Sequence, residues 1–125
     1  MRALQIVVAV LALIPTLSGA AGVLLGPDFL QLDPPWPADL DSHFRFLSGV
    51  FLAVGIGFYT TIPRIDAKAG RFRLLAALVF AGGLARLLSL SIAGPPSAGH
   101  LAGLVMELAV VPLLVLWQAR IARRV

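Results

Sequence analysis

Residues 74–93 read LLAALVFAGGLARLLSLSIA, an apolar stretch of 20 residues that holds a single charge, Arg86. A helix of about 20 apolar residues crosses the hydrocarbon core of a bilayer. Three further stretches are also long and apolar with at most one charge, and they run from about Leu4 to Leu25, Phe44 to Ile62 and Leu101 to Ala119. Because backbone groups in lipid must bond within their own segment, each is expected to be helical. The sequence predicts an all-α integral membrane four-helix bundle, up-down-up-down, forming one domain over residues 1–125.

The composition favours a membrane protein over a soluble globule. Of the 125 residues, 59% are hydrophobic and 13% are charged, and the mean hydropathy is +0.95. Soluble domains carry about 25% charged residues, and a domain this small has too much surface to hide so many apolar side chains from water. The chain has no cysteine, which excludes disulfides, thiolate metal sites and cysteine nucleophiles.

Positive charge gathers on one side of the predicted membrane. Eight Lys and Arg residues fall at the N-terminus, between the second and third spans, and at the C-terminus: Arg2, Arg64, Lys68, Arg71, Arg73, Arg120, Arg123 and Arg124. The other side has one, Arg45. Loops rich in Lys and Arg stay in the cytoplasm, so both termini are predicted to be cytoplasmic. The net charge of +4 therefore reflects orientation and contact with anionic lipid head groups, and no nucleic-acid partner is expected.

The first span has a second interpretation. Arg2, the apolar stretch after it and Ser18-Gly19-Ala20 also fit a cleavable signal peptide. The apolar run nevertheless continues to Leu25, which is long enough to cross the membrane. We expect the span to be retained, and its cleavage would leave three helices in the same orientation.

Glycine, alanine and proline predict how the helices connect, bend and pack. The longest connection, from Gly26 to Ser42, contains four prolines, and regular helix is not expected over most of it. Pro15 and Pro112 each remove a backbone donor and are predicted to kink their helices. Small residues at every fourth position are typical of packing seams in lipid. Such rows are Gly49, Ala53 and Gly57 on the second span and Ala77, Ala81, Ala85, Ser89 and Ala93 on the third.

Two ionisable residues lie inside apolar spans at matching depths. Arg86 is seven residues from the outer end of the third span, and Glu107 is six residues from the outer end of the fourth. At about 1.5 Å per residue, both lie roughly 9–11 Å below the outer boundary. A short link makes these spans antiparallel neighbours, and a lone charge in lipid costs several kcal/mol. The sequence therefore predicts that Arg86 and Glu107 pair, with Gly82 and Gly103 leaving room beside them.

Other polar side chains gather at the same end of the spans. Asp41, His43 and Arg45 open the second span, and His100 precedes the fourth. Arg45 and Arg86 can hold an acidic or carbonyl group by forked hydrogen bonds, while His43 can give or take a proton. The sequence predicts a ligand-binding pocket in the outer half of the bundle, lined by Arg86, Glu107, Arg45, His43 and Asp41.

Two alternatives to a pocket stay open. In the first, Arg86 and Glu107 form a purely structural ion pair. In the second, His43 and His100 bind a metal ion or haem. The sequence has no nucleophile elbow, paired-histidine zinc motif or phosphate loop, so no catalytic residue is predicted. We expect a non-enzymatic protein with no cofactor and no bound metal.

The polar residues inside the hydrophobic spans resemble those of a known family. The resemblance rests on Asp41-Ser42-His43-Phe44-Arg45-Phe46, Gly82-Gly83-Leu84-Ala85-Arg86, Glu107 and Trp117-Gln118. They are similar to the small four-helix bacterial membrane proteins of domain of unknown function 4345, over nearly the whole chain. The resemblance implies a four-helix protein of the bacterial inner membrane and brings no activity, cofactor or substrate. A looser likeness to proteins of the DoxX kind, often linked to redox or thiol chemistry, concerns the fold alone.

These observations favour a non-enzymatic membrane protein that binds a small amphipathic ligand, such as a lipid or a quinone. The alternative is an accessory or assembly subunit of a larger membrane complex, because the rows of small residues exceed what so short a bundle needs for itself. The partners expected are membrane lipids and, for a subunit, another membrane protein or a second copy of the chain.

Overall fold

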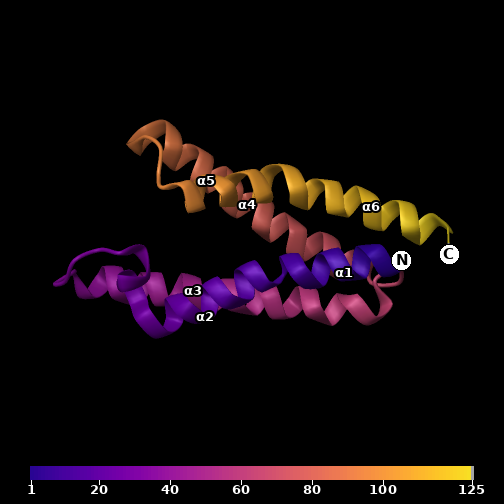
Figure 1. Ribbon diagram of the computed structural model, residues 1–125, viewed down its shortest axis with the longest axis horizontal. Helices are drawn as coiled ribbons and strands as arrows, with labels where there is room; N and C mark the ends of the chain where they lie inside the picture. Colours follow the sequence, from indigo (N-terminus) through magenta and orange to yellow (C-terminus); the bar gives the residue numbers. More distant parts are fainter. Residues whose placement is uncertain (125) are drawn as a thin grey trace. The chain divides into compact units, whose positions relative to one another are not determined.

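The computed structural model describes residues 1–124, which are mostly helical and contain no strand (Figure 1). The α-helices are α1 (Arg2–Leu11), α2 (Leu13–Leu25), α3 (Ala38–Thr61), α4 (Ala69–Ala93), α5 (Ala98–Val105) and α6 (Val111–Arg124). Short 3-10 turns follow α2 (Gly26–Leu30) and α3 (Ile62–Arg64), and a π turn (Met106–Val110) joins α5 to α6. Four stretches are long and apolar enough to cross a membrane: Arg2–Leu30, Ala38–Arg64, Ala69–Ala93 and Ala98–Arg124. The predicted all-α fold with four membrane-spanning helices is confirmed.

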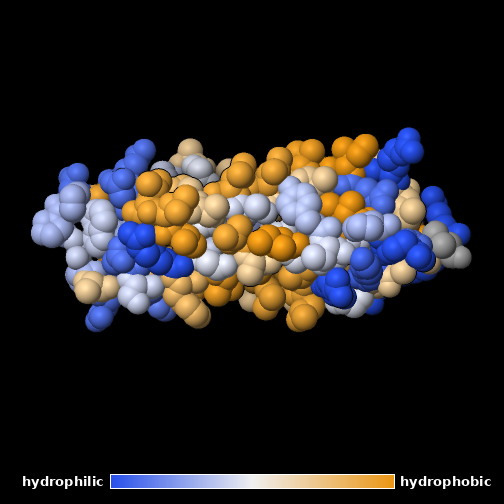
Figure 2. Space-filling view, turned by 90° about the horizontal axis from the view of Figure 1, so that it is seen from below, coloured by the Kyte–Doolittle hydropathy of each residue, from blue (hydrophilic) through white to orange (hydrophobic). Residues whose placement is uncertain are grey.

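The surface of the helices is suited to lipid. Only 11–22% of each apolar span is buried inside the protein. Leu24, Ile92 and Leu116 expose 77%, 76% and 66% of their surfaces. On the face shown in Figure 2, apolar side chains cover the middle of the helices and hydrophilic ones lie toward their ends. Exposing this much apolar area to water would cost about 25 cal/mol per Å², a cost that a bilayer removes.

Contacts divide the chain into two compact units, each built around neighbouring helices. One unit is Gln5–Pro63, and the other combines Met1–Leu4 with the chain from Arg64 onward. In the first, α2 packs along α3; in the second, α4 packs against α5, the π turn and α6 (Figure 1). The prediction that the third and fourth spans are antiparallel neighbours is confirmed.

Glycines allow α2 and α3 to approach closely. A Cβ atom on Gly19 would lie 2.5 Å from the Leu52 backbone nitrogen and 2.8 Å from the Ser48 carbonyl oxygen. A Cβ atom on Gly55 of α3 would lie 2.8 Å from the Thr16 backbone nitrogen. Backbone atoms cannot move aside cheaply, so both positions require glycine. Close approach of this kind increases the van der Waals contact that holds helices together in lipid.

Pro15 interrupts the first span, as predicted. α1 ends at Leu11 and α2 begins at Leu13, because proline has no N–H to donate to the carbonyl oxygen four residues earlier. Beside this break, the Tyr59 hydroxyl of α3 donates to the Ala9 carbonyl oxygen at 2.7 Å. This hydrogen bond ties α3 to α1 two residues before α1 ends.

In the other unit, α4 and the residues just before it contact the α5–α6 segment at two levels. A Cβ atom on Gly83 would lie 2.8 Å from both the Glu107 Cβ and the Leu108 Cδ2, so this glycine sets a close approach. Farther along, the fully buried Gln118 donates from Nε2 to the Ile65 carbonyl oxygen at 2.8 Å. Together the two contacts fix how the segments lie along each other.

The prediction that regular helix is absent from most of the Gly26–Ser42 connection is confirmed for residues 26–37 and wrong for residues 38–42, which already belong to α3. Only residues 31–37 lack helical structure, because a 3-10 turn opens the connection and α3 already begins at Ala38. Asp39 and Asp41 lie in the first turn of α3, where carboxylates interact favourably with the positive end of the helix dipole. A search for apolar residues starts the helix too late, because this first turn is polar.

Within each unit, the buried small residues are not those of the predicted small-residue rows. In α3 the buried row contains Ser48 and Gly55, whereas Ala53 is exposed. In α4 it contains Ala76 and Gly83. In both helices the buried small residues are seven residues apart, so they lie on one helix face. Of the predicted rows, Gly49 does contact α2, since its Cβ position lies 3.8 Å from the Val23 Cγ2. The other predicted members that are exposed take no part in these contacts: Ala53 in α3 and Ala77, Ala81, Ala85, Ser89 and Ala93 in α4.

Gly19→Ala is expected to lower the free energy of unfolding by about 1–3 kcal/mol, because its methyl group would press on backbone atoms of α3. Gly82→Ala is the matched control, since nothing lies within 4 Å of a Cβ atom there. Titration of the detergent-solubilised variants with SDS, followed by circular dichroism, measures the difference. Equal stability of the two variants would show that α2 and α3 are not held this close.

Candidate polar site in the membrane-spanning helices

The predicted pairing of Arg86 with Glu107 is confirmed. The Arg86 Nε donates to both carboxylate oxygens, at 2.5 Å to Oε1 and 3.2 Å to Oε2. The Glu107 side chain is 9% exposed and that of Arg86 is 38% exposed. In an apolar span, the pair gives each charge a partner and so avoids the cost of two isolated charges.

The helix around Glu107 is wound more widely than an α-helix. Pro112 has no N–H, and in an α-helix its ring would press on the carbonyl group of Leu108. Here the Val111 N–H instead donates to the Met106 carbonyl oxygen, five residues earlier, which closes a π turn. The sequence predicted a kink at Pro112, and the structure has a π turn just before this proline. Single π turns inside α-helices often occur at functional sites, and this one contains the buried carboxylate.

Glycines on both sides make room for the ion pair. Gly83 lies against the Glu107 Cβ, as described above, and Gly103 would place a Cβ atom 3.6 Å from the Glu107 Oε1. The prediction that Gly103 leaves room beside the ion pair is therefore confirmed. The same prediction for Gly82 is wrong, because nothing lies within 4 Å of its Cβ position. Its neighbour Gly83 faces the other helix instead.

His100 is the third member of this cluster, and the sequence did not identify it as a partner of Arg86. The Arg86 Nη1 lies 3.0 Å from the His100 Nδ1. A guanidinium group can only donate, so Nδ1 accepts and a neutral imidazole then carries its proton on Nε2. A usable signal was present: His100 precedes Glu107 by seven residues, which places both on one face of a helix.

A small hollow lies beside the cluster. Its volume is about 120 Å³, and it is lined by Arg86, Ser89, Leu90, Pro96, His100 and Leu104. Pockets that bury a whole drug-sized molecule measure about 300–1,000 Å³. This hollow is too small to enclose a whole molecule of that kind.

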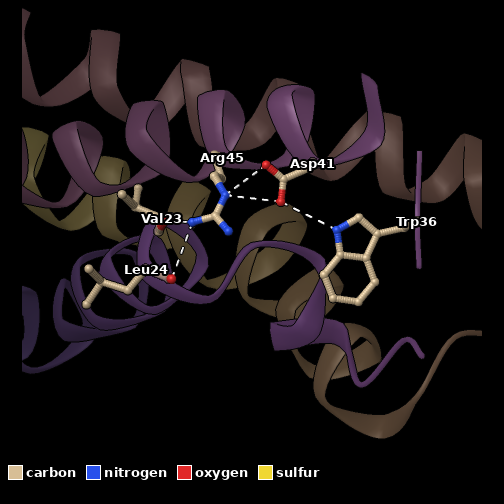
Figure 3. Close-up of polar contacts among 5 residues, drawn as sticks. All are labelled: Val23, Leu24, Trp36, Asp41 and Arg45. Atoms are coloured by element: carbon tan, nitrogen blue, oxygen red, sulfur yellow. Dashed lines mark hydrogen bonds and ion pairs between the residues drawn. The ribbon is translucent and has the colours of Figure 1, made fainter. Parts of the chain in front are cut away.

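Asp41 and Arg45 form a second cluster, in the unit that contains α2 and α3 (Figure 3). The Arg45 Nε donates to both Asp41 oxygens, at 3.2 and 3.0 Å, one turn apart on α3. Its Nη1 donates to the carbonyl oxygens of Val23 at 2.6 Å and Leu24 at 3.3 Å. Trp36 adds a longer hydrogen bond to Asp41, at 3.4 Å.

This second cluster caps a helix, a role that the sequence analysis missed. The last carbonyl groups of a helix have no donor within it, and a nearby cation also interacts favourably with the negative end of the helix dipole. Arg45 supplies both at the end of α2. The Asp41–Arg45 pair could have been predicted from the four-residue spacing, which is typical of ion pairs on a helix.

His43 completes the set of predicted site residues. It is exposed on α3, and its ring stacks on that of Phe46 with centroids 6.5 Å apart. The structure thus pairs Arg86 with Glu107 and Asp41 with Arg45. That all five residues line one pocket stays a prediction. Among residues 1–124, no group of three or more His, Cys, Asp or Glu side chains is placed to hold a metal ion.

Nearly the whole chain matches one protein-family model. The model describes a domain of unknown function, DUF4345, and it matches residues 3–118, which include both clusters. The chain belongs to the DUF4345 family. The predicted family resemblance is therefore confirmed. No curated protein and no solved structure matches this DUF4345 chain.

In this DUF4345 protein, replacing one member of the ion pair is expected to lower the free energy of unfolding more than replacing both. Arg86→Met or Glu107→Met leaves one charge unpaired in an apolar span, and each should lower the free energy of unfolding by about 2–4 kcal/mol. The double variant should recover most of this loss, because no lone charge remains. SDS unfolding of the four proteins gives the coupling energy. A double loss equal to the sum of the single losses would show that the two charges act independently.

Proposed function

We propose that this DUF4345 protein binds the polar head group of a small amphipathic molecule at Arg86 and His100, without catalysing a reaction. The supporting observation is an arginine within a membrane-spanning helix that has donors to spare. A guanidinium group has five N–H donors. Arg86 uses Nε for Glu107 and one Nη1 hydrogen for His100, and its Nη2 has no partner among residues 1–124.

The available donors define the chemistry of the ligand. Arg86 can only donate, and His100, which accepts from Arg86 through Nδ1, keeps its proton on Nε2. Both oxygens of Glu107 are already engaged by Arg86. A ligand group at these side chains must therefore offer oxygen atoms as acceptors, as a carboxylate, a phosphate or a quinone carbonyl does.

The apolar part of the ligand also has a place. Leu90, Pro96 and Leu104 line the hollow beside the polar groups. The hollow takes the head group, and the remainder of the molecule lies along the exposed apolar surface of α4 and α5. A lipid or a quinone that enters from the bilayer fits this division.

The distribution of positive charge supports a location and an orientation for the protein. We place the protein in the inner membrane of a bacterium with both termini in the cytoplasm. The support is the eight-to-one distribution of Lys and Arg between the two sides of the predicted membrane. In this orientation, Arg86 and Glu107 lie in the outer half of their spans, so the head group binds near the non-cytoplasmic surface.

A second candidate is an accessory subunit of a larger membrane complex, in which the Arg86–Glu107 pair is purely structural. Its support is the row of small residues on α4, of which Ala77, Ala81 and Ala85 are exposed. Rows of this kind pack against other helices in lipid. The partner is then another membrane protein or a second copy of the chain.

Filling the hollow is expected to remove the ligand. Ser89→Leu adds a side chain to its lining, whereas Ser91→Leu adds the same side chain to an exposed position of α4 outside the lining. Wild type and both variants are purified from membranes in mild detergent, and their solvent extracts are compared by mass spectrometry. We expect a molecule with an oxygen acceptor in wild type and Ser91→Leu, reduced about tenfold or more in Ser89→Leu, since tenfold corresponds to about 1.4 kcal/mol of lost affinity.

The R86M/E107M double variant provides an independent check, because it removes the donors without leaving a lone charge. It should lose the same molecule. If all preparations carry the same molecules in the same amounts, or if wild type carries none, the binding proposal is wrong. Native gels of the same samples test the second candidate, which requires migration with a partner rather than as a single small species.

Labelling of single cysteines is expected to report cytoplasmic termini. The chain has no cysteine, so Ala67→Cys and Ser97→Cys each introduce one exposed thiol, before and after α4. In intact cells, a membrane-impermeant maleimide should label Ser97→Cys and leave Ala67→Cys unlabelled until the membrane is opened. The reverse pattern would show that the orientation is inverted.

A further inference from the structure

One end of the unit that contains α4 and α6 is strongly basic. Seven of the ten Lys and Arg residues belong to the segment around the start of α4 or to the end of α6: Arg64, Lys68, Arg71, Arg73, Arg120, Arg123 and Arg124. The buried contact between Gln118 and Ile65 brings these two segments to the same end. Their one acidic residue, Asp66, has a side chain only 9% exposed and lies 3.9 Å from the Arg64 Nε. The exposed charge at this end is therefore positive.

On α6, this charge continues an apolar stripe. Leu113, Leu116, Trp117, Arg120, Arg123 and Arg124 recur every three or four residues, so they share one helix face, called here the α6 stripe. Leu113 and Leu116 are 63% and 66% exposed, and the three arginines are exposed as well. Along the chain, the stripe changes from aliphatic to aromatic to cationic.

That order matches the layers of a phospholipid. Acyl chains lie in the hydrocarbon core, tryptophan favours the interface beside it, and the phosphate groups lie farther out. A hollow of about 260 Å³ runs along the first part of the stripe and is lined by Leu113, Leu116, Trp117 and Arg120. The hollow therefore joins an apolar wall to a guanidinium group through the indole ring.

We propose that the α6 stripe is a binding site for an anionic phospholipid. An acyl chain lies on Leu113 and Leu116, and Arg120 binds the phosphodiester through the forked hydrogen bonds that arginine forms with phosphate. Arg123 and Arg124, one turn farther on, attract the net negative charge of the head group. A zwitterionic lipid gains less, because its ammonium group is repelled by the same arginines. This site is distinct from the hollow at Arg86 and does not depend on the proposed function.

Fluorescence quenching by brominated lipids tests the proposal directly. The chain has two tryptophans, and Trp36→Phe leaves Trp117 as the one reporter. The replacement removes the 3.4 Å hydrogen bond to Asp41, which lies in the unit that does not contain α6. The protein is reconstituted in phosphatidylcholine bilayers with a fixed fraction of either brominated phosphatidylglycerol or brominated phosphatidylcholine.

We expect the quenching of Trp117 to correspond to a local enrichment of phosphatidylglycerol of about three- to fivefold, the size expected from the roughly 1 kcal/mol that one arginine near the membrane surface contributes. Arg120→Gln should remove most of the enrichment. Arg73→Gln is the matched control, because Arg73 is an exposed arginine at the same basic end but on α4. It should leave the enrichment nearly unchanged. Circular dichroism confirms that both variants are folded.

Three outcomes would overturn the proposal. Equal quenching by the two lipids would mean that the stripe does not select anionic head groups. Equal loss in Arg120→Gln and Arg73→Gln would mean that the general positive charge, and not the stripe, attracts the lipid. Little quenching by either lipid would mean that a protein surface, from a partner or a second copy, covers Trp117.

Discussion

A guanidinium and a carboxylate cannot remain isolated within hydrocarbon, and this constraint determines how α4 meets the segment from α5 to α6. Arg86 and Glu107 each lie within an otherwise apolar helix, and each provides the other's partner. The contact requires close helices, which Gly83 permits. It also leaves the guanidinium only partly used, and His100 takes one more of its donors. The need to pair charges in the bilayer therefore holds in place the arginine with spare donors on which the proposed binding site depends.

The unit formed by α2 and α3 is held together in a different way. Its close contacts are made by Gly19 and Gly55 against backbone atoms of the opposite helix, with no charge at that level. Its ionic cluster lies at the end of α2, where Arg45 binds carbonyl groups that the helix itself cannot satisfy. The unit of α2 and α3 thus has van der Waals contact along its helices and an ion pair at one end. The unit of α4, α5 and α6 has its ion pair within the apolar part of its helices.

The sequence predicts how deep a residue lies in the membrane better than it predicts which way its side chain points. The depth of a residue in the membrane follows from counting along a helix, so the four spans and the meeting of Arg86 with Glu107 were predictable. Which way a side chain points depends on how the helices rotate against each other, which counting does not give. The predicted small-residue rows therefore missed the buried Gly55 and Ala76, and Gly82 was chosen in place of Gly83. The π turn was hidden as well, because it arises from the ring of Pro112 acting on the preceding backbone.

The two polar contacts of the segment after α4 also limit where the chain can change in length. Glu107 meets Arg86 and Gln118 meets the Ile65 carbonyl, both on α4 or just before it. An insertion or deletion between Glu107 and Gln118 would rotate one of them by about 100° relative to the other, leaving a buried polar group without its partner. The link between α4 and α5 has no such restriction, since loops accept extra residues at small entropic cost. Among members of the family, length variation should therefore collect in that link and be absent between Glu107 and Gln118.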